Sequence, residues 1–170
     1  MKKQFMIAAL AASVFIVSCG NDKGKENEKA TEPATEQPTT TNDNTTAVSN
    51  TIEITANDEM KFDKIELRVK ANEKVTLTLK NIGKLPVQSM AHNFVLLKEG
   101  TNQGDFALKA NQSAPEYIPA DMTSSIIAHT KLLGPGESDT IEFTVPAGSY
   151  TYICSFPGHY PNMMGILTAE

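Results

Sequence analysis

Apolar and polar side chains alternate along four short stretches of the chain. Every second residue is apolar in runs that begin near residues 52, 75, 141 and 150. A period of two over four to eight residues is typical of a strand with one buried face. Turn-forming residues such as Gly134-Pro135-Gly136 and Pro146-Ala147-Gly148 separate the runs. The pattern predicts an all-β domain over residues 51–170, an antiparallel Greek-key β-sandwich or barrel.

One segment of this domain departs from the alternation. Residues 99–125 are too many for a hairpin loop and contain Gly100, Gly104, Pro115 and Pro119. Residues 103–112 are compatible with a short helix. We therefore expect residues 99–125 to form an excursion between strands, with one short helix, packed over a face of the sandwich.

The residues before the domain have a different composition. From residue 20 to residue 46 the only apolar side chains are two alanines, among Thr, Glu, Asn, Lys and Pro. Such a stretch cannot bury enough surface to offset the entropy of ordering it. We interpret residues 19–50 as a disordered tether, with a removable pro-segment as the alternative.

The first residues resemble a bacterial lipoprotein signal. Met1-Lys2-Lys3 is basic, and the apolar run at residues 5–17 is too short to span a bilayer. It ends at Ile16-Val17-Ser18-Cys19, where cleavage would make Cys19 the acylated N-terminus. We expect residues 1–18 to be the signal peptide and the protein to be lipid-anchored in the cell envelope, periplasmic or surface-facing. An ordinary secretory signal that contains a cysteine is the alternative.

Charge and cysteine content narrow the function. The formal net charge is −5 and no basic stripe is present, which argues against a nucleic-acid partner. The chain has two cysteines, so acylation of Cys19 would leave Cys154 without a disulfide partner. A free thiol outside the cytoplasm is open to oxidation. A metal bond would explain why Cys154 is there.

Three potential metal ligands lie within ten residues of each other. Cys154 is followed by His159 and Met163, and Pro157-Gly158 between them favours a tight turn. A further donor must come from elsewhere, and His92 lies at the start of an apolar run. A thiolate, imidazoles and a long axial thioether form the ligand set of a blue-copper electron-transfer site. Met163 suits the axial role better than Met164, because strand alternation would turn Met164 away; we expect a surface or structural role for His129.

These motifs resemble the azurins of the cupredoxin family. The C-terminal pattern is Cys154, Phe156-Pro157-Gly158, His159, Met163 and Gly165. Two further segments match, Met90-Ala91-His92-Asn93 and residues 127–134, and the resemblance covers about residues 51–170. It implies a cupredoxin-like fold that holds one copper ion.

The resemblance also implies a role for each site residue. His92, Cys154 and His159 would be equatorial ligands, with a weak axial Met163 and a distant backbone carbonyl of Ala91. Asn93 and the backbone N–H of Phe156 would donate hydrogen bonds to the Cys154 sulfur. His159 would emerge through an apolar patch as the electron port. The patch residues would be Met60, Leu85, Met90, Phe156, Pro157 and Pro161.

The implied function is one-electron transfer by a monomer, not catalysis. Its partners would be redox proteins of the envelope, with a c-type cytochrome as a family-level expectation. The alternatives are a Cys–His nucleophile pair in an enzyme, for which no substrate pocket is evident, and a copper delivery or storage protein.

Four departures from the azurin pattern stand out. Ala91 replaces the usual glycine, and the disulfide common in azurins is absent. Asn81 occupies the position of a pH-sensitive histidine of some azurins. Asn162 and the large Tyr160 make the rim of the patch more polar.

Overall fold

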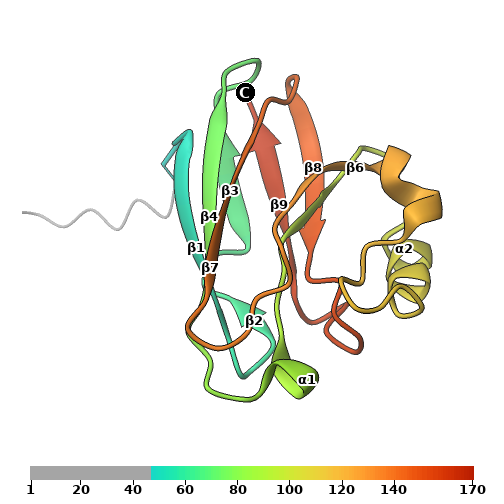
Figure 1. Ribbon diagram of the computed structural model, residues 1–170. Helices are drawn as coiled ribbons and strands as arrows, with labels where there is room; N and C mark the ends of the chain where they lie inside the picture. The colour runs from blue at the N-terminus through green and yellow to red at the C-terminus, as the bar shows by residue number, and fades with distance from the viewer. Residues whose placement is uncertain (1–46) are drawn as a thin grey trace, which may run out of the picture. The chain divides into compact units, whose positions relative to one another are not determined.

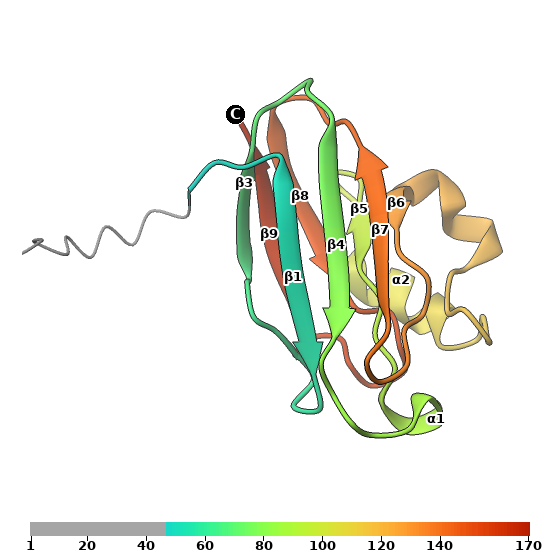
Figure 2. The same ribbon diagram turned by 60° about the vertical axis from the view of Figure 1, so that its left-hand side comes forward.

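The computed structural model describes residues 47–170. The predicted signal peptide, most of the predicted tether and Cys19 lie outside these residues. The described strands form two sheets that face each other as two layers (Figures 1 and 2). The first has the order β2-β1-β4-β7 and the second the order β3-β9-β8-β5-β6. The bounds are β1 Thr51–Asn57, β2 Lys61–Phe62, β3 Glu66–Val69, β4 Val75–Asn81, β5 Val95–Leu97, β6 Ile126–His129, β7 Ser138–Phe143, β8 Gly148–Ile153 and β9 Met164–Ala169.

The predicted sandwich is confirmed, and the barrel alternative is not, because the two sheets remain separate. The antiparallel prediction was wrong at two pairings. β1 runs parallel to β4, with Ile52 opposite Leu77, and β3 runs parallel to β9. The chain leaves the first sheet after β2 to form β3 in the second sheet. It then returns as β4 in the same direction as β1, so two neighbouring strands are parallel.

The main core lies between the two sheets. The apolar residues that alternate along β1 and β4 point into it, as the sequence predicts. Its centre is a cluster of three aromatic rings, in which Phe94 stacks on Tyr152 at 4.9 Å between centroids and Phe62 contacts both edge-on. The buried Tyr152 hydroxyl donates to the carbonyl of Lys64 at 2.7 Å. An aromatic side chain that keeps its polar group bonded can be buried at little cost.

A second, smaller core explains the continuous apolar run in β5. Leu96 faces the main core, whereas Val95 and Leu97 face the other side of the sheet. There they pack against Phe106 and Ala110 of helix α2, Gln103–Ala110. A strand covered on both faces needs apolar residues at every position. The excursion at residues 99–125 therefore covers the outer face of the five-stranded sheet, as predicted.

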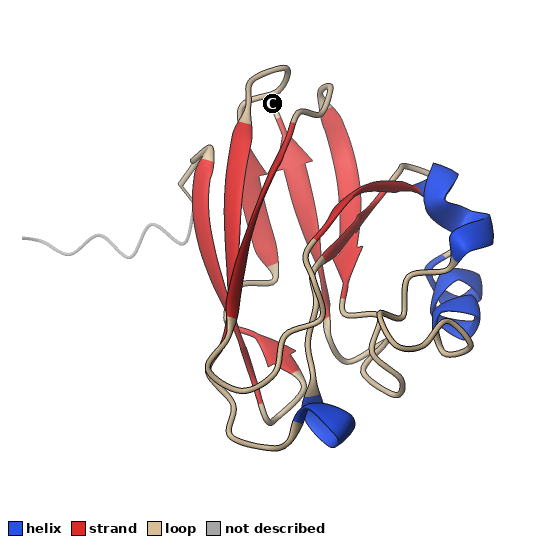
Figure 3. Cartoon of the chain, in the orientation of Figure 1, coloured by secondary structure: helices blue, strands red, loops and turns tan. Residues whose placement is uncertain are grey.

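In the described part of the chain, three short helical segments lie outside the sheets (Figure 3). α2 begins after Asn102, whose side chain accepts a hydrogen bond from the backbone N–H of Asp105 at 3.0 Å. The 3-10 helix η1, Ala120–Ser125, ends the excursion. Helix α1, Val87–Met90, was not predicted; its four residues are too few to show helical periodicity.

The two ends of the sandwich differ. α1 lies at one end, and the C-terminus and the start of β1 lie at the other (Figure 2). Within residues 47–170, no helix is long and apolar enough to cross a membrane. Residues 48–50 already contact the domain, since Ser49 N donates to the carbonyl of Arg68 and Lys70 N donates to the side chain of Asn50.

Candidate metal centre

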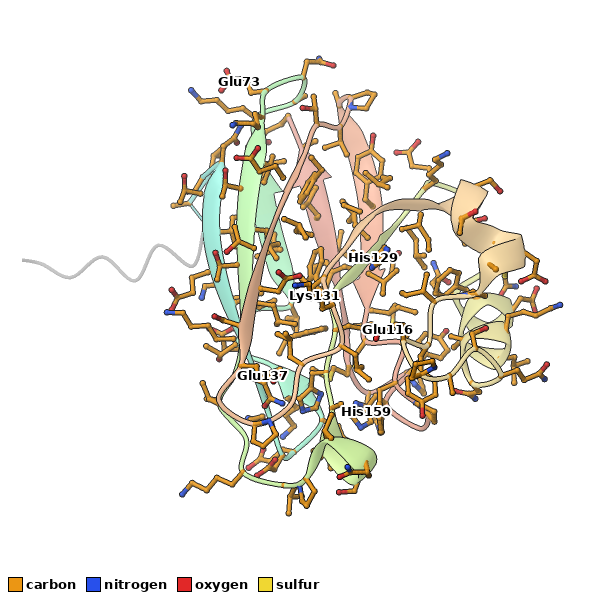
Figure 4. All side chains as sticks on the ribbon, in the orientation of Figure 1. Glu73, Glu116, His129, Lys131, Glu137 and His159 are labelled. Carbon is orange, nitrogen blue, oxygen red and sulfur yellow. The ribbon has the colours of Figure 1, made fainter. Side chains whose placement is uncertain are left out.

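Three buried side chains from two distant segments converge at the end of the sandwich near α1. One donor atom each from His92, Cys154 and His159 lies within 4.8 Å of the other two. The side chains are 0%, 0% and 2% exposed, respectively. Figure 4 shows His159 at this end, whereas His129 lies farther along the sandwich. The exposed His129 is not part of the cluster, and its Nδ1 contacts the carbonyl of Thr130 at 3.0 Å.

His92 is held by main-chain pairing just before β5. Its backbone N–H donates to the carbonyl of Leu133 at 3.1 Å, and Leu133 N donates back at 2.8 Å. Its Nδ1 lies 3.9 Å from the Cys154 sulfur. The backbone of His92 is therefore fixed by a segment about forty residues away in the chain.

Cys154 and His159 lie in one loop between β8 and β9, and the loop closes on itself. Cys154 N donates to the carbonyl of Met163 at 3.0 Å, His159 N to that of Phe156 at 3.1 Å, and Met163 N to that of His159 at 3.0 Å. Gly158 has φ +82°, a left-handed conformation that glycine adopts without steric cost. This tight turn brings His159 Nδ1 to 3.3 Å from the Cys154 sulfur.

The two adjacent methionines face opposite sides of the sheet. Met163 is fully buried in the main core, which also contains Cys154 and Ala91. Met164 packs against the second, smaller core on the outer face of the five-stranded sheet, which also contains Ile153; we call this the outer core. Alternation at the start of β9 thus turns the thioether of Met163, not that of Met164, toward the side of the thiol.

Burial favours the neutral forms of the Cys154 thiol and of the two imidazoles, His92 and His159. It raises the pKa of the Cys154 thiol to about 12, opposed by hydrogen bonds from the backbone of Asn93 and Phe156. Burial, with a smaller repulsion from His92, lowers the pKa of His159 to about 4. Burial likewise lowers the pKa of His92, although the nearby backbone of Asn57 opposes this. The His92 Nε2 has no hydrogen-bond partner within residues 47–170.

This donor set fits a single soft metal ion. A thiol that resists ionisation loses its proton when a cation binds to the sulfur, and neutral imidazoles already present a lone pair. Two imidazoles and one thiolate, with a thioether nearby, suit copper in both of its common oxidation states. The rings of His92 and His159 are 4.9 Å apart, so both can face one ion.

A buried hydrogen-bond network joins the two ligand segments. The Asn93 side chain accepts from Ser155 N at 2.8 Å and donates through Nδ2 to Ser155 Oγ at 2.8 Å. Ser155 Oγ in turn donates to the carbonyl of Tyr117 at 2.7 Å. Sequence reasoning singled out Asn93 but missed Ser155 and Tyr117. The signal for Ser155 was its place directly after Cys154; nothing in the sequence pointed to Tyr117.

The predicted patch residues are unevenly exposed. Leu85 is 44% exposed, Met60, Met90 and Pro157 are half-buried, and Pro161 is exposed. Phe156 is buried, with its ring 4.8 Å from that of His159. Val87 of α1, which was not predicted, adds another exposed apolar side chain.

Comparison with known proteins gives consistent matches. A family model described as copper binding proteins of the plastocyanin/azurin family matches residues 47–170. An azurin of Achromobacter denitrificans is 42% identical over 120 residues, which cover 67% of this chain and 80% of that protein. Auracyanin-A of Chloroflexus aurantiacus is 42% identical over 126 residues, which cover 71% of this chain and 74% of that protein. The crystal structure of dithionite-reduced auracyanin from Roseiflexus castenholzii matches with a TM-score of 0.66 and 38% identity, covering 73% of this chain and 99% of that one.

Proposed function

The chain belongs to the plastocyanin/azurin family of copper-binding proteins, and we propose that it is a membrane-tethered carrier of single electrons between redox proteins of the bacterial cell envelope. The observation that supports this proposal is the buried convergence of His92, Cys154 and His159 within 4.8 Å. These residues hold one copper ion. The proposed role is electron transfer, not catalysis.

The protein residues contribute geometry and exclusion of water. Copper supplies a one-electron couple between Cu(I) and Cu(II). His92 and the loop from Cys154 to Met163 are fixed by main-chain hydrogen bonds. A donor set that cannot rearrange much keeps the change in geometry between oxidation states small, which favours fast electron transfer. Met163 is proposed as the axial donor, with the Ala91 carbonyl as a distant contact.

Burial of the donors favours a carrier over a copper delivery or storage protein. A delivery protein must present its ligands to a partner. Here none of the three donors is more than 2% exposed. Release of the ion would require the loop to open.

The colour of the protein tests the copper assignment. The full chain loaded with Cu(II) should be intensely blue because of thiolate-to-copper charge transfer, and Cys154→Ser should remove the band completely. His129→Ala is the matched control and should keep the band, because His129 lies outside the cluster. A colourless Cu(II) complex of the folded wild-type chain would refute the assignment.

The exposed apolar side chains near His159 are proposed as the docking surface for redox partners. With a c-type cytochrome as the probe, Leu85→Glu should slow electron transfer because it places a charge in the contact. Val48→Glu is the control: Val48 is 43% exposed, close to the 44% of Leu85, and lies just before β1, which begins at the end of the sandwich away from α1. Equal rates for both variants would rule out this surface.

Tethering through Cys19 is a separate part of the proposal. The described chain enters β1 at the end of the sandwich away from α1 (Figure 2), whereas His159 lies near the α1 end (Figure 4), so attachment upstream of β1 would leave the proposed docking surface open to partners. Cys19→Ala should move the protein from the membrane fraction to the soluble fraction. Unchanged fractionation would contradict lipid anchoring.

A further inference from the structure

Tyr117, in the excursion at residues 99–125, contacts the loop from Cys154 to Met163, and its own backbone is strained. Its φ is +55°, in the left-handed region, which an aromatic residue adopts only at a cost of roughly 1 kcal/mol or more. Its N–H donates to the carbonyl of Ser113 at 2.8 Å, and its own carbonyl accepts from Ser155 Oγ at 2.7 Å. The strained residue thus reaches the position directly after the ligand Cys154.

The Ser155 hydroxyl has a fixed orientation. Its oxygen lies 2.7 Å from the Tyr117 carbonyl and 3.2 Å from Asn93 Oδ1, and it has a single proton to donate. The shorter contact takes the proton, and the oxygen then accepts from Asn93 Nδ2 at 2.8 Å. The hydroxyl therefore links the excursion to both ligand segments.

The Tyr117 ring contacts the next residue of the same loop. It meets the Phe156 ring edge-on at 5.2 Å between centroids, and Phe156 contacts the His159 ring at 4.8 Å. The backbone N–H of Phe156 interacts with the Cys154 sulfur and opposes the rise in the pKa of the thiol that burial causes. One residue of the excursion therefore holds both residues that follow the thiol.

We propose that Tyr117 is a positioning residue: through its carbonyl on Ser155 and its ring on Phe156, it holds the Phe156 N–H against the Cys154 sulfur. A hydrogen bond to a thiolate draws off negative charge and stabilises the reduced metal, so it raises the reduction potential. The excursion thus tunes a site to which it contributes no ligand. The effect on potential rests on the proposed function, whereas the effect on the N–H does not.

Amide hydrogen exchange and electrochemistry of the full chain test this role. In the copper-free protein, Tyr117→Ala should speed exchange of the Phe156 amide by about five- to tenfold, the equivalent of roughly one hydrogen bond, relative to the Leu77 amide in the other sheet. In the copper-loaded protein the same variant should lower the reduction potential. Tyr117→Phe keeps the backbone and the ring, and should match wild type in both measurements. Ser155→Ala should act in the same direction, and the double variant should show less than the sum of the two effects.

The outcomes separate the two hypotheses. Equal acceleration at Phe156 and Leu77 would mean general destabilisation and would overturn the positioning role. An unchanged potential in a blue Tyr117→Ala protein would overturn the tuning role. If the wild-type chain bound no copper, the proposed function would fail, and exchange at the Phe156 amide would still decide whether Tyr117 positions this N–H.

Discussion

The two segments that supply the proposed copper ligands are held in different ways. His92 is fixed by hydrogen bonds to Leu133, a residue distant in sequence, and is entirely buried. The loop from Cys154 to Met163 is fixed mainly by hydrogen bonds among its own residues. One segment is therefore built by tertiary pairing, whereas the other is largely built by local turn geometry.

The positions of the two segments therefore depend on different parts of the molecule. The main-chain bonds that shape the loop join its own residues. Pairing with Leu133 makes the position of His92 depend on the whole fold. Asn93, through Ser155, provides the direct side-chain link between the segments. Substitutions in the loop should therefore change the chemistry of the donor side chains. Substitutions at Asn93 or Ser155 should change how firmly the loop is held to the His92 segment.

The largest effect we expect comes from the titration of His159 in the loop. Its pKa is about 4 in the folded copper-free protein, against 6.5 as its ordinary value. Above pH 6.5 the imidazole is neutral in both states. As the pH falls from 6.5 to 4, only the unfolded chain takes up the proton, so the free energy of unfolding should fall by roughly 3 kcal/mol.

Urea unfolding of the copper-free chain between pH 7 and pH 4 measures this contribution. His159→Ala is the matched variant, and its stability should fall less over the same range because it lacks this group. Parallel curves for the two proteins would show that His159 is not held neutral by the fold.

Removal of the link between the segments should have the next largest effect. Asn93→Ala removes two short hydrogen bonds with Ser155 and leaves buried polar groups unpaired, so it should cost about 2–3 kcal/mol. Asn50→Ala is the control, since it also loses two hydrogen bonds, to the Lys74 carbonyl and the Lys70 N–H, in the segment just before β1. It should cost about 1 kcal/mol. Urea unfolding measures both costs, and absorption spectra should show a shifted copper band in the Asn93 variant alone. Identical spectra would show that the link does not reach the metal.

The contrast between the segments also explains what could be predicted from sequence. Cys154, His159 and Met163 were recognisable because local spacing determines the loop, and the family resemblance carried by these motifs is confirmed. The position of His92 was inferred from the resemblance, but its pairing with Leu133 was not. The parallel pairing of β1 with β4 was missed because alternation gives the period of a strand and not its direction. Tyr117 was missed because its effect depends on a backbone conformation that has no local sequence signal.

The smallest effect should come from the proposed axial side chain, Met163. The adjacent Met164 provides its control. Met163 lies in the main core on the side of Cys154, whereas Met164 faces the outer core. Met163→Leu keeps His92, Cys154 and His159, so the protein should stay blue. Loss of the thioether should raise the reduction potential on the order of 60 mV, which corresponds to a tenfold change in the equilibrium constant of a one-electron couple. Met164→Leu removes the same sulfur one position along and should leave the potential unchanged. Voltammetry of the two variants decides the assignment: a shift in the Met164 variant, or none in the Met163 variant, would mean that the axial donor is not Met163.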